Sequence, residues 1–250
     1  MSAFQDLLAR TQLDGEFDYL RRLPSGKARL WHTAFEWFCK GLFGLYCPLR
    51  VQGRENLPPP PFLLCSNHCS HMDSTALMHA TGMGFGSFGM VAAQDYFFDH
   101  AHRKNSLPML MNLIPAERKS TRQTLARLMV ACREFSRCGP RNIILYPEGT
   151  RSRTGEMSPL KKGVAMIAAE LGLPIVPAYV RGTFQSLPKG VSFPRPARIR
   201  VHIGKPIDPG RFAANDDNTG MNRLIYTRIT HELERRLHEL RDECERLHGR

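Results

Sequence analysis

Short apolar runs alternate with segments of helical periodicity along most of this chain, and no other feature constrains its fold as much. The strand-like runs are residues 62–66, 88–92, 143–146, 174–180 and 199–203. The helix-like segments are residues 74–81, 121–138 and 159–171. Alternation of apolar strands with helices is typical of parallel sheets. We therefore predict an α/β fold with a mostly parallel central sheet flanked by helices. Residues 113–119 are expected to form a short apolar turn that ends in two cationic residues, Arg118 and Lys119.

Amphipathic helices are expected on both sides of this core. In residues 29–47, large apolar side chains recur at helical spacing. They are Trp31, Phe35, Phe38, Leu42 and Leu45. A helix that packs on the core and a helix that lies in a membrane interface give the same pattern, so both interpretations stay open. A second stripe near the C-terminus consists of Ile225, Ile229, Leu233, Leu237, Leu240 and Leu247.

These patterns divide the chain into three parts. Residues 1–50 form an N-terminal helical appendage that is a candidate for membrane docking, and residues 51–210 form the core. Residues 211–250 form a C-terminal amphipathic helix packed on that core. A length of 250 residues fits a single hydrophobic core with such appendages.

The net charge of the chain indicates which class of partner it binds, and its cysteine content indicates the redox compartment in which it works. The chain carries 35 Lys and Arg against 23 Asp and Glu, a net charge of +12. This excess favours anionic partners, which include phosphorylated ligands, acidic lipid surfaces and nucleic acid.

The seven cysteines are scattered and form no Cys-x-x-Cys pair, as expected in a reducing compartment. We recognise no secretory signal and no apolar stretch of about 18 residues, so we expect no membrane span.

A His and an Asp five positions apart follow the strand-like run at residues 62–66. His68 falls on the loop after this run, and Asp73 falls at the start of the next helix. In that arrangement the carboxylate can bind one ring nitrogen, and the other nitrogen can accept a proton from a hydroxyl. The residues alone also fit a helix N-cap at Asp73 beside an ordinary loop histidine. Both interpretations stand at this point.

Three other functional interpretations of short motifs in the sequence are disfavoured. Cys69 could act as a nucleophile, but a free cysteine is more often only packed. His68, His71 and Asp73 lack a further donor at a recognisable metal-ligand spacing, so no metal site is expected. Residues 84–89 match the glycine pattern of dinucleotide-binding loops, but that pattern needs a strand before it and a helix after it. Here the predicted order is reversed.

Several of these loops together resemble the glycerolipid acyltransferase family, which includes the 1-acylglycerol-3-phosphate and other lysophospholipid acyltransferases. The matching residues are His68 and Asp73 of an Asn-His-x-x-x-x-Asp block, Arg118 of an arginine-bearing turn, residues 148–152 of a Glu-Gly-Thr-Arg-Ser block, and residues 173–177 of a fourth block. Blocks in this order are far more specific than any one of them, and they favour the catalytic interpretation of His68. The resemblance covers roughly residues 30–207. Tyr146 stands where the family more often has Phe.

The resemblance implies transfer of a fatty acyl group from acyl-CoA or acyl carrier protein to the free hydroxyl of a lysophospholipid. The leading acceptor is 1-acyl-glycerol-3-phosphate, which would give phosphatidic acid. His68 would act as the general base and Asp73 would orient it. The implied substrate-binding residues are Asn67, Arg118, Glu148, Gly149, Thr150 and Arg151, with Lys119, Lys161 and Lys162 as further candidate contacts for phosphate or donor. The resemblance implies no cofactor or metal beyond the thioester co-substrate.

Two alternatives stay open. The same blocks occur in relatives that acylate another lyso-lipid or an amino-lipid hydroxyl. In a different class, a non-catalytic basic protein could bind acidic membrane surfaces. Nucleic acid is not expected as a partner, because basic stretches such as residues 195–211 contain few aromatic side chains. We expect peripheral or monotopic attachment at the cytoplasmic face of a membrane.

Overall fold

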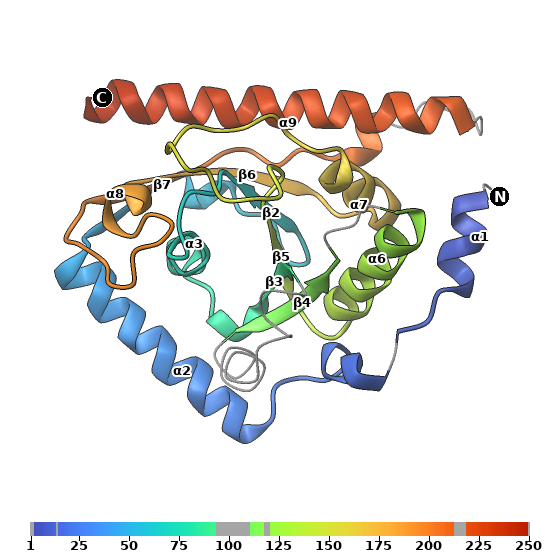
Figure 1. Cartoon of the computed structure of the whole chain (residues 1–250), viewed down its shortest axis with the longest axis horizontal. Coiled ribbons are helices and arrows are strands. Elements are labelled where there is room, and N and C mark those ends of the chain that lie inside the picture. Colours follow the sequence, from blue (N-terminus) through green and yellow to red (C-terminus); the bar gives the residue numbers. More distant parts are fainter. Residues whose placement is uncertain (1–2, 14, 94–110, 118–120, 213–218, 250) are drawn as a thin grey trace.

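A seven-stranded sheet forms the centre of the molecule in the computed structural model, which describes residues 3–13, 15–93, 111–117, 121–212 and 219–249 (Figure 1). The strands are β1 (Leu49–Gln52), β2 (Leu63–Ser66), β3 (Phe88–Ala93), β4 (Asn112–Ala116), β5 (Asn142–Leu145), β6 (Ile175–Arg181) and β7 (Ile199–Ile203). Their order is β1-β7-β6-β2-β5-β3-β4. Within the described residues, every neighbouring pair is parallel except β6 and β7. The predicted mostly parallel sheet is confirmed.

Helices cover both faces of the sheet. The α-helices are α1 (Ala3–Arg10), α2 (Gly26–Gly41), α3 (Asp73–Thr81), α6 (Arg122–Arg137), α7 (Gly163–Leu171), α8 (Thr183–Ser186) and α9 (Thr219–His248). Shorter helical turns are η1 (Gly15–Arg21), η2 (Leu42–Tyr46), η3 (Arg54–Asn56), η4 (Phe85–Ser87) and η5 (Pro209–Phe212). In Figure 1, α3 lies on one side of the sheet, α6 and α7 lie on the other, and α2 lies outside α3. Helix α9 crosses the whole top of the view.

Apolar residues of the central strands alternate between two buried clusters, one on each face of the sheet. In β2, Leu63 and Cys65 belong to the cluster that α6, α7 and α9 complete, whereas Leu64 belongs to the cluster that α2 and α3 complete. Strand β5 repeats this alternation. Successive side chains of a strand point to opposite faces, so a strand covered on both faces is apolar throughout. This explains the continuous apolar runs in the sequence.

The segment predicted as an apolar turn is instead the edge strand β4. It pairs in parallel with β3, and Pro115 lies opposite Ala92. Proline cannot donate a backbone hydrogen bond, which an edge strand tolerates because one of its sides is unpaired. The prediction of a turn was therefore wrong for residues 112–116. The two cations expected to follow it, Arg118 and Lys119, lie outside the described residues.

Two further elements differ from the prediction. The helix expected over residues 159–171 begins only at Gly163. The backbone N–H of Lys161 donates to the carbonyl of Pro147 at 2.9 Å, which holds the preceding segment against the loop after β5. Strand β1 was not predicted, because its four residues alternate between partly buried and exposed and form no apolar run.

The glycine-rich passage at residues 84–89 follows α3 and leads into β3, so its rejection as a dinucleotide-binding loop is confirmed.

Both ends of the chain contribute to the same buried cluster. Phe17 and Leu20 from η1 and Leu233 and Leu237 from α9 belong to the cluster on the α6 and α7 face. Leu247 was predicted on the apolar stripe of the C-terminal helix, but its side chain is exposed. The predicted division of the chain into three parts stays a prediction.

The sheet brings three loops to one edge. Strands β2, β5 and β6 are adjacent and parallel, so the residues that follow Ser66, Leu145 and Arg181 leave the sheet on the same side. The carboxyl ends of parallel strands are where open α/β sheets place their binding residues. This edge carries the polar loops that the sequence singled out.

Candidate active site

His68 and Asp73 form a hydrogen-bonded pair at this edge. The Nδ1 atom of His68 lies 2.9 Å from Oδ2 of Asp73. Asp73 is the first residue of α3 and is fully buried, whereas the His68 side chain is 18% exposed. The same Oδ2 atom accepts the backbone N–H groups of Cys69 at 2.7 Å and Ser70 at 2.8 Å. The loop between the two residues thus wraps around one carboxylate oxygen.

This pairing fixes the orientation of the imidazole. A carboxylate at this position accepts a hydrogen bond from the Nδ1–H of His68, which selects the tautomer of the neutral ring in which Nε2 carries no hydrogen. The Nε2 atom of His68 makes no hydrogen bond to any residue that the structure describes. It is therefore available to accept a proton from a bound hydroxyl.

Tyr146 packs flat against the His68 ring. The two ring centroids lie 3.7 Å apart with an angle of 10° between the planes. The Tyr146 hydroxyl lies 2.6 Å from the hydroxyl of Ser74, which follows Asp73 in α3. Burial, with the charge of Asp73, raises the pKa of Tyr146 well above its usual value, so its hydroxyl stays protonated. The imidazole is held between its carboxylate partner and an aromatic face.

Glu148 joins the two loops that leave β2 and β5. Its Oε1 atom accepts the backbone N–H of His68 at 2.8 Å, and its Oε2 atom accepts the N–H of Ser158 at 2.9 Å. The carbonyl of His68 accepts the N–H of Ser152 at 2.7 Å. Burial raises the pKa of Glu148, although the backbone N–H groups of Ser158 and His68 lower it in part. Both carboxylate oxygens are occupied by backbone groups, so this side chain positions His68, and its predicted contact with a substrate stays a prediction.

Asn67 performs a similar positioning role on the other side of β2. It is buried, and its side chain pairs with the backbone of Val180 in β6 through both its oxygen at 2.8 Å and its nitrogen at 2.9 Å. Side-chain amides can satisfy a backbone N–H and C=O together in this way. Asn67 therefore fixes the start of the His68 loop to the neighbouring strand.

The predicted cationic residues separate into those at the site and those elsewhere. A Cβ atom added at Gly149, which has φ +71°, would lie 2.8 Å from the Nζ atom of Lys161, so this lysine lies directly over the turn. Thr150 is exposed and Arg151 is partly exposed on the same turn, and Arg151 makes no ion pair with a described residue. Lys162 instead donates to the Thr227 hydroxyl on α9 at 2.9 Å.

A protein-family model described as Acyltransferase matches residues 48–181, which is more than half of the chain. This chain belongs to the acyltransferase family. The matched region includes β2, α3 and β5, and so contains the His68 loop and the Glu148 loop.

Individual relatives agree with this family. A chloroplastic 1-acyl-sn-glycerol-3-phosphate acyltransferase of Brassica napus is 33% identical over 166 residues, which cover 63% of this chain and 44% of the relative. A 1-acyl-sn-glycerol-3-phosphate acyltransferase of Saccharomyces cerevisiae is 30% identical over 202 residues, which cover 73% of this chain and 59% of the relative. The chain thus spans about half the length of the curated relatives it matches.

The fold also has a solved counterpart. The crystal structure of the 1-acyl-sn-glycerophosphate acyltransferase PlsC from Thermotoga maritima superposes with a TM-score of 0.57 and covers 92% of this chain and 87% of the other. The two sequences are 23% identical, so this likeness bears on the fold.

In this member of the acyltransferase family, Cys69 is not suited to act as a nucleophile. The thiol is buried, and burial together with the charge of Asp73 raises its pKa to about 12. The thiolate is the reactive form, and it is scarce at neutral pH when the pKa is this high. The described residues contain no group of three His, Cys, Asp or Glu side chains placed to hold a metal ion.

The sequence analysis missed the residues that position His68 from outside its own loop. Tyr146 was noted only as a departure from the family pattern, and neither Ser74 nor Ser158 was singled out. Tyr146 and His68 each follow a strand directly or closely, and β2 and β5 are neighbours in the sheet. The position of Tyr146 at the end of its strand was the available signal, because loops after adjacent parallel strands lie close together.

Proposed function

We propose that this chain transfers a fatty acyl group from a thioester donor to the free hydroxyl of a lysophospholipid. The observation that carries this proposal is the hydrogen bond between His68 and Asp73, with the second imidazole nitrogen left available. The family to which the chain belongs supports the reaction class. The names of the relatives support 1-acyl-glycerol-3-phosphate as the acceptor and phosphatidic acid as the product.

The proposed chemistry needs no covalent enzyme intermediate. The Nε2 atom of His68 removes the proton of the acceptor hydroxyl while its oxygen attacks the thioester carbonyl carbon. The imidazolium that forms is stabilised by the Asp73 carboxylate. The C–S bond then breaks, the ester is released, and the thiolate of the carrier takes the proton back from His68. Acyl-CoA and acyl carrier protein both supply such a thioester.

Cations near the Glu148 turn would hold the phosphate of the acceptor. Arg151 and Lys161 lie at this turn, and Gly149 lets the backbone come close to a ligand there. A phosphate held by positioned cations places the nearby hydroxyl next to the base, which accounts for a large part of the rate of such reactions. Arg118 is proposed for the same role from its position in the family pattern.

We further propose that α2 attaches the protein to the cytoplasmic face of a membrane. His32, Cys39 and Phe43 of α2 and η2 are buried against the core. The outward side forms an exposed α2 stripe, which consists of Leu30, Trp31, Trp37, Phe38, Leu45 and Tyr46. Apolar and aromatic side chains on one face of a helix suit an interfacial position. No helix in the described part of the chain has the length and apolar character to cross a bilayer.

Release of free CoA from acyl-CoA, dependent on added lysophosphatidate, tests the proposed reaction. His68→Ala is expected to lower this rate by about 10²–10⁴-fold, because it removes the general base. His231→Ala serves as the control, because His231 is an exposed histidine on α9. Circular dichroism would verify that both variants are folded.

The same assay separates the enzyme from a binding protein. Equal rates in His68→Ala and wild type would contradict the proposed mechanism. Binding of wild-type protein to acidic vesicles without any acyl transfer would favour the non-catalytic alternative. A panel of lyso-lipid and amino-lipid acceptors would identify the acceptor head group.

A further inference from the structure

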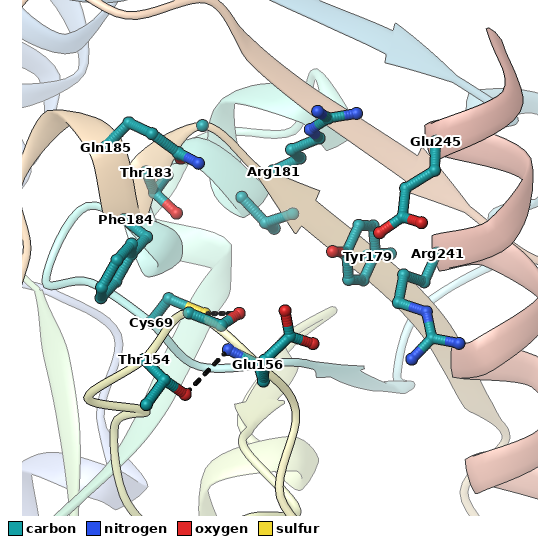
Figure 2. Close-up of a pocket in the computed structure, with 13 residues that line it drawn as sticks. Cys69, Thr154, Glu156, Tyr179, Arg181, Thr183, Phe184, Gln185, Arg241 and Glu245 are labelled. Carbon is teal, nitrogen blue, oxygen red and sulfur yellow. Dashed lines mark hydrogen bonds between the residues drawn. The ribbon is translucent and has the colours of Figure 1, made fainter. Parts of the chain in front are cut away.

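A polar cavity lies beside the His68 loop. Its volume is about 500 Å³, which is within the range of small-molecule sites. Cys69, the residue after His68, and residues 154–156 line one part of it, and the Cys69 thiol donates to the Gly155 carbonyl at 3.5 Å. The rest of the wall comes from the end of β6, from α8 and from the last turns of α9 (Figure 2).

The lining of the cavity is polar and balanced in charge. Arg181 and Arg241 contribute positive charge, and Glu156 and Glu245 contribute negative charge. Arg241 is already engaged by Asp242, to which its Nε and Nη2 atoms donate at 2.9 and 2.7 Å. Such a lining disfavours a fatty acyl chain because polar groups would lose hydration, and it offers no net positive charge to a phosphate.

Thr183 provides an unused hydrogen-bonding group on this wall. Its side chain is 1% exposed, and its hydroxyl has no hydrogen-bond partner among the described residues. Figure 2 places it beside Phe184 and Gln185, with the amide of Gln185 on the same wall. Buried hydroxyl groups are normally paired, so an unpaired one in a cavity wall points to a ligand that supplies the partner.

We infer that this cavity binds the pantetheine arm of the acyl donor. This inference rests on the proposed function. Of the parts of the two proposed substrates, the arm is the one that is extended, uncharged and rich in amide and hydroxyl groups, and it ends at the thioester. Its amides can donate and accept hydrogen bonds, as Thr183 and Gln185 require. Acyl-CoA and acyl carrier protein carry the same arm, so the cavity accepts either donor.

Two variants test the inference through donor kinetics. Thr183→Val removes the hydroxyl and keeps the shape of the side chain, and Gln185→Trp fills the cavity from an exposed position. We expect Thr183→Val to raise the KM for palmitoyl-CoA about 2- to 10-fold, as for one lost hydrogen bond, with the KM for lysophosphatidate unchanged. Gln185→Trp should have a larger effect. Thr183→Ser and Gln123→Trp, at an exposed position on α6, should match wild type.

Shortened acyl donors test the same inference, because they remove parts of the arm or of the nucleotide. S-palmitoyl-N-acetylcysteamine lacks most of the arm, so the variants should use it as well as wild type does. Palmitoyl-pantetheine keeps the arm without the nucleotide and should show the same loss as palmitoyl-CoA, and palmitoyl acyl carrier protein should show it too. Loss with palmitoyl-CoA alone would assign the cavity to the nucleotide and overturn the inference.

The outcomes separate this inference from the proposed function. Unchanged donor KM in both variants, or a rise in the acceptor KM alone, would overturn the inference while acyl transfer by wild type stands. If wild type transfers no acyl group, calorimetric titration with free CoA still tests the cavity. Weaker CoA binding in Gln185→Trp than in Gln123→Trp would support the inference, and equal binding or none would overturn it.

Discussion

The geometry of His68 depends on residues outside the His-x-x-x-x-Asp pattern. Asp73 holds one edge of the imidazole, and Tyr146 covers its face with ring centroids 3.7 Å apart. Glu148 accepts the N–H of His68 and so fixes the backbone from which the ring projects. The spacing of His68 and Asp73 was visible in the sequence. The contribution of Tyr146 was not, because it depends on which strands are neighbours in the sheet.

Variants at Tyr146 separate the ring from its hydroxyl. Tyr146→Leu removes the aromatic face, and we expect kcat to fall about 2- to 10-fold, as for one lost aromatic contact, with little change in either KM. Tyr146→Phe keeps the face and loses only the bond to Ser74, so it should retain kcat close to that of wild type. Steady-state kinetics with lysophosphatidate would measure both. A kcat in Tyr146→Leu equal to that of wild type would argue against the positioning role.

At the scale of elements, continuous apolar runs predicted the buried strands well, because β2, β5 and β6 are covered on both faces. The edge strands gave a weaker signal. Strand β4 contains Pro115, which reads as a turn, and β1 alternates in burial over only four residues. The start of α7 depends on the hydrogen bond from Lys161 to Pro147, a contact between separate loops that periodicity does not contain.

Helix α2 illustrates a pattern that the sequence left open and the structure resolves into two sides. Phe35 packs against Phe85 with ring centroids 6.0 Å apart, whereas Trp31 and Phe38 are exposed. One side of the helix therefore packs on the core, and the other is free of it. The core-packing interpretation holds for one side of the helix, and the membrane-interface interpretation of the exposed side stays a prediction.

Removal of the α2 stripe should release the protein from membranes. We expect the combined variant Trp31→Ser, Phe38→Ser and Leu45→Ser to float poorly with acidic liposomes, because each apolar side chain contributes up to about 1.5–3 kcal/mol when buried. Leu224→Ser is the control, because Leu224 is an exposed apolar residue on α9, outside the α2 stripe. Liposome flotation is the measurement. Undiminished binding of the triple variant would contradict membrane docking through α2.

At the scale of the whole molecule, segments from both ends of the chain complete the core around the central sheet. Arg141, beside β5, donates to the carbonyl of Arg22 at 2.8 Å and stacks on the Phe135 ring at 4.3 Å. On the same face, α9 contributes Leu233 and Leu237 to the buried cluster. The apolar stripe of α9 was readable from its periodicity. Its extent was not readable, because Leu247 follows the pattern although its side chain is exposed.

Truncation of α9 side chains should therefore affect global stability according to burial. Leu237→Ala is expected to lower the free energy of unfolding by about 2–5 kcal/mol, because it leaves a cavity in the main cluster. Leu247→Ala, at an exposed position on the same helix, should change it by less than about 0.5 kcal/mol. Urea denaturation would measure both. Equal effects of the two substitutions would show that α9 is not an integral part of the core.

The two main-chain donors on Asp73 carry a consequence for which sequences this loop can accept. Cys69 and Ser70 contribute N–H groups to the carboxylate, and any residue that retains an amide hydrogen supplies the same contact. Proline has none. These two contacts to Asp73 therefore do not depend on the side chains at 69 and 70, but a proline at either position would remove one hydrogen bond from the carboxylate and weaken its hold on the imidazole.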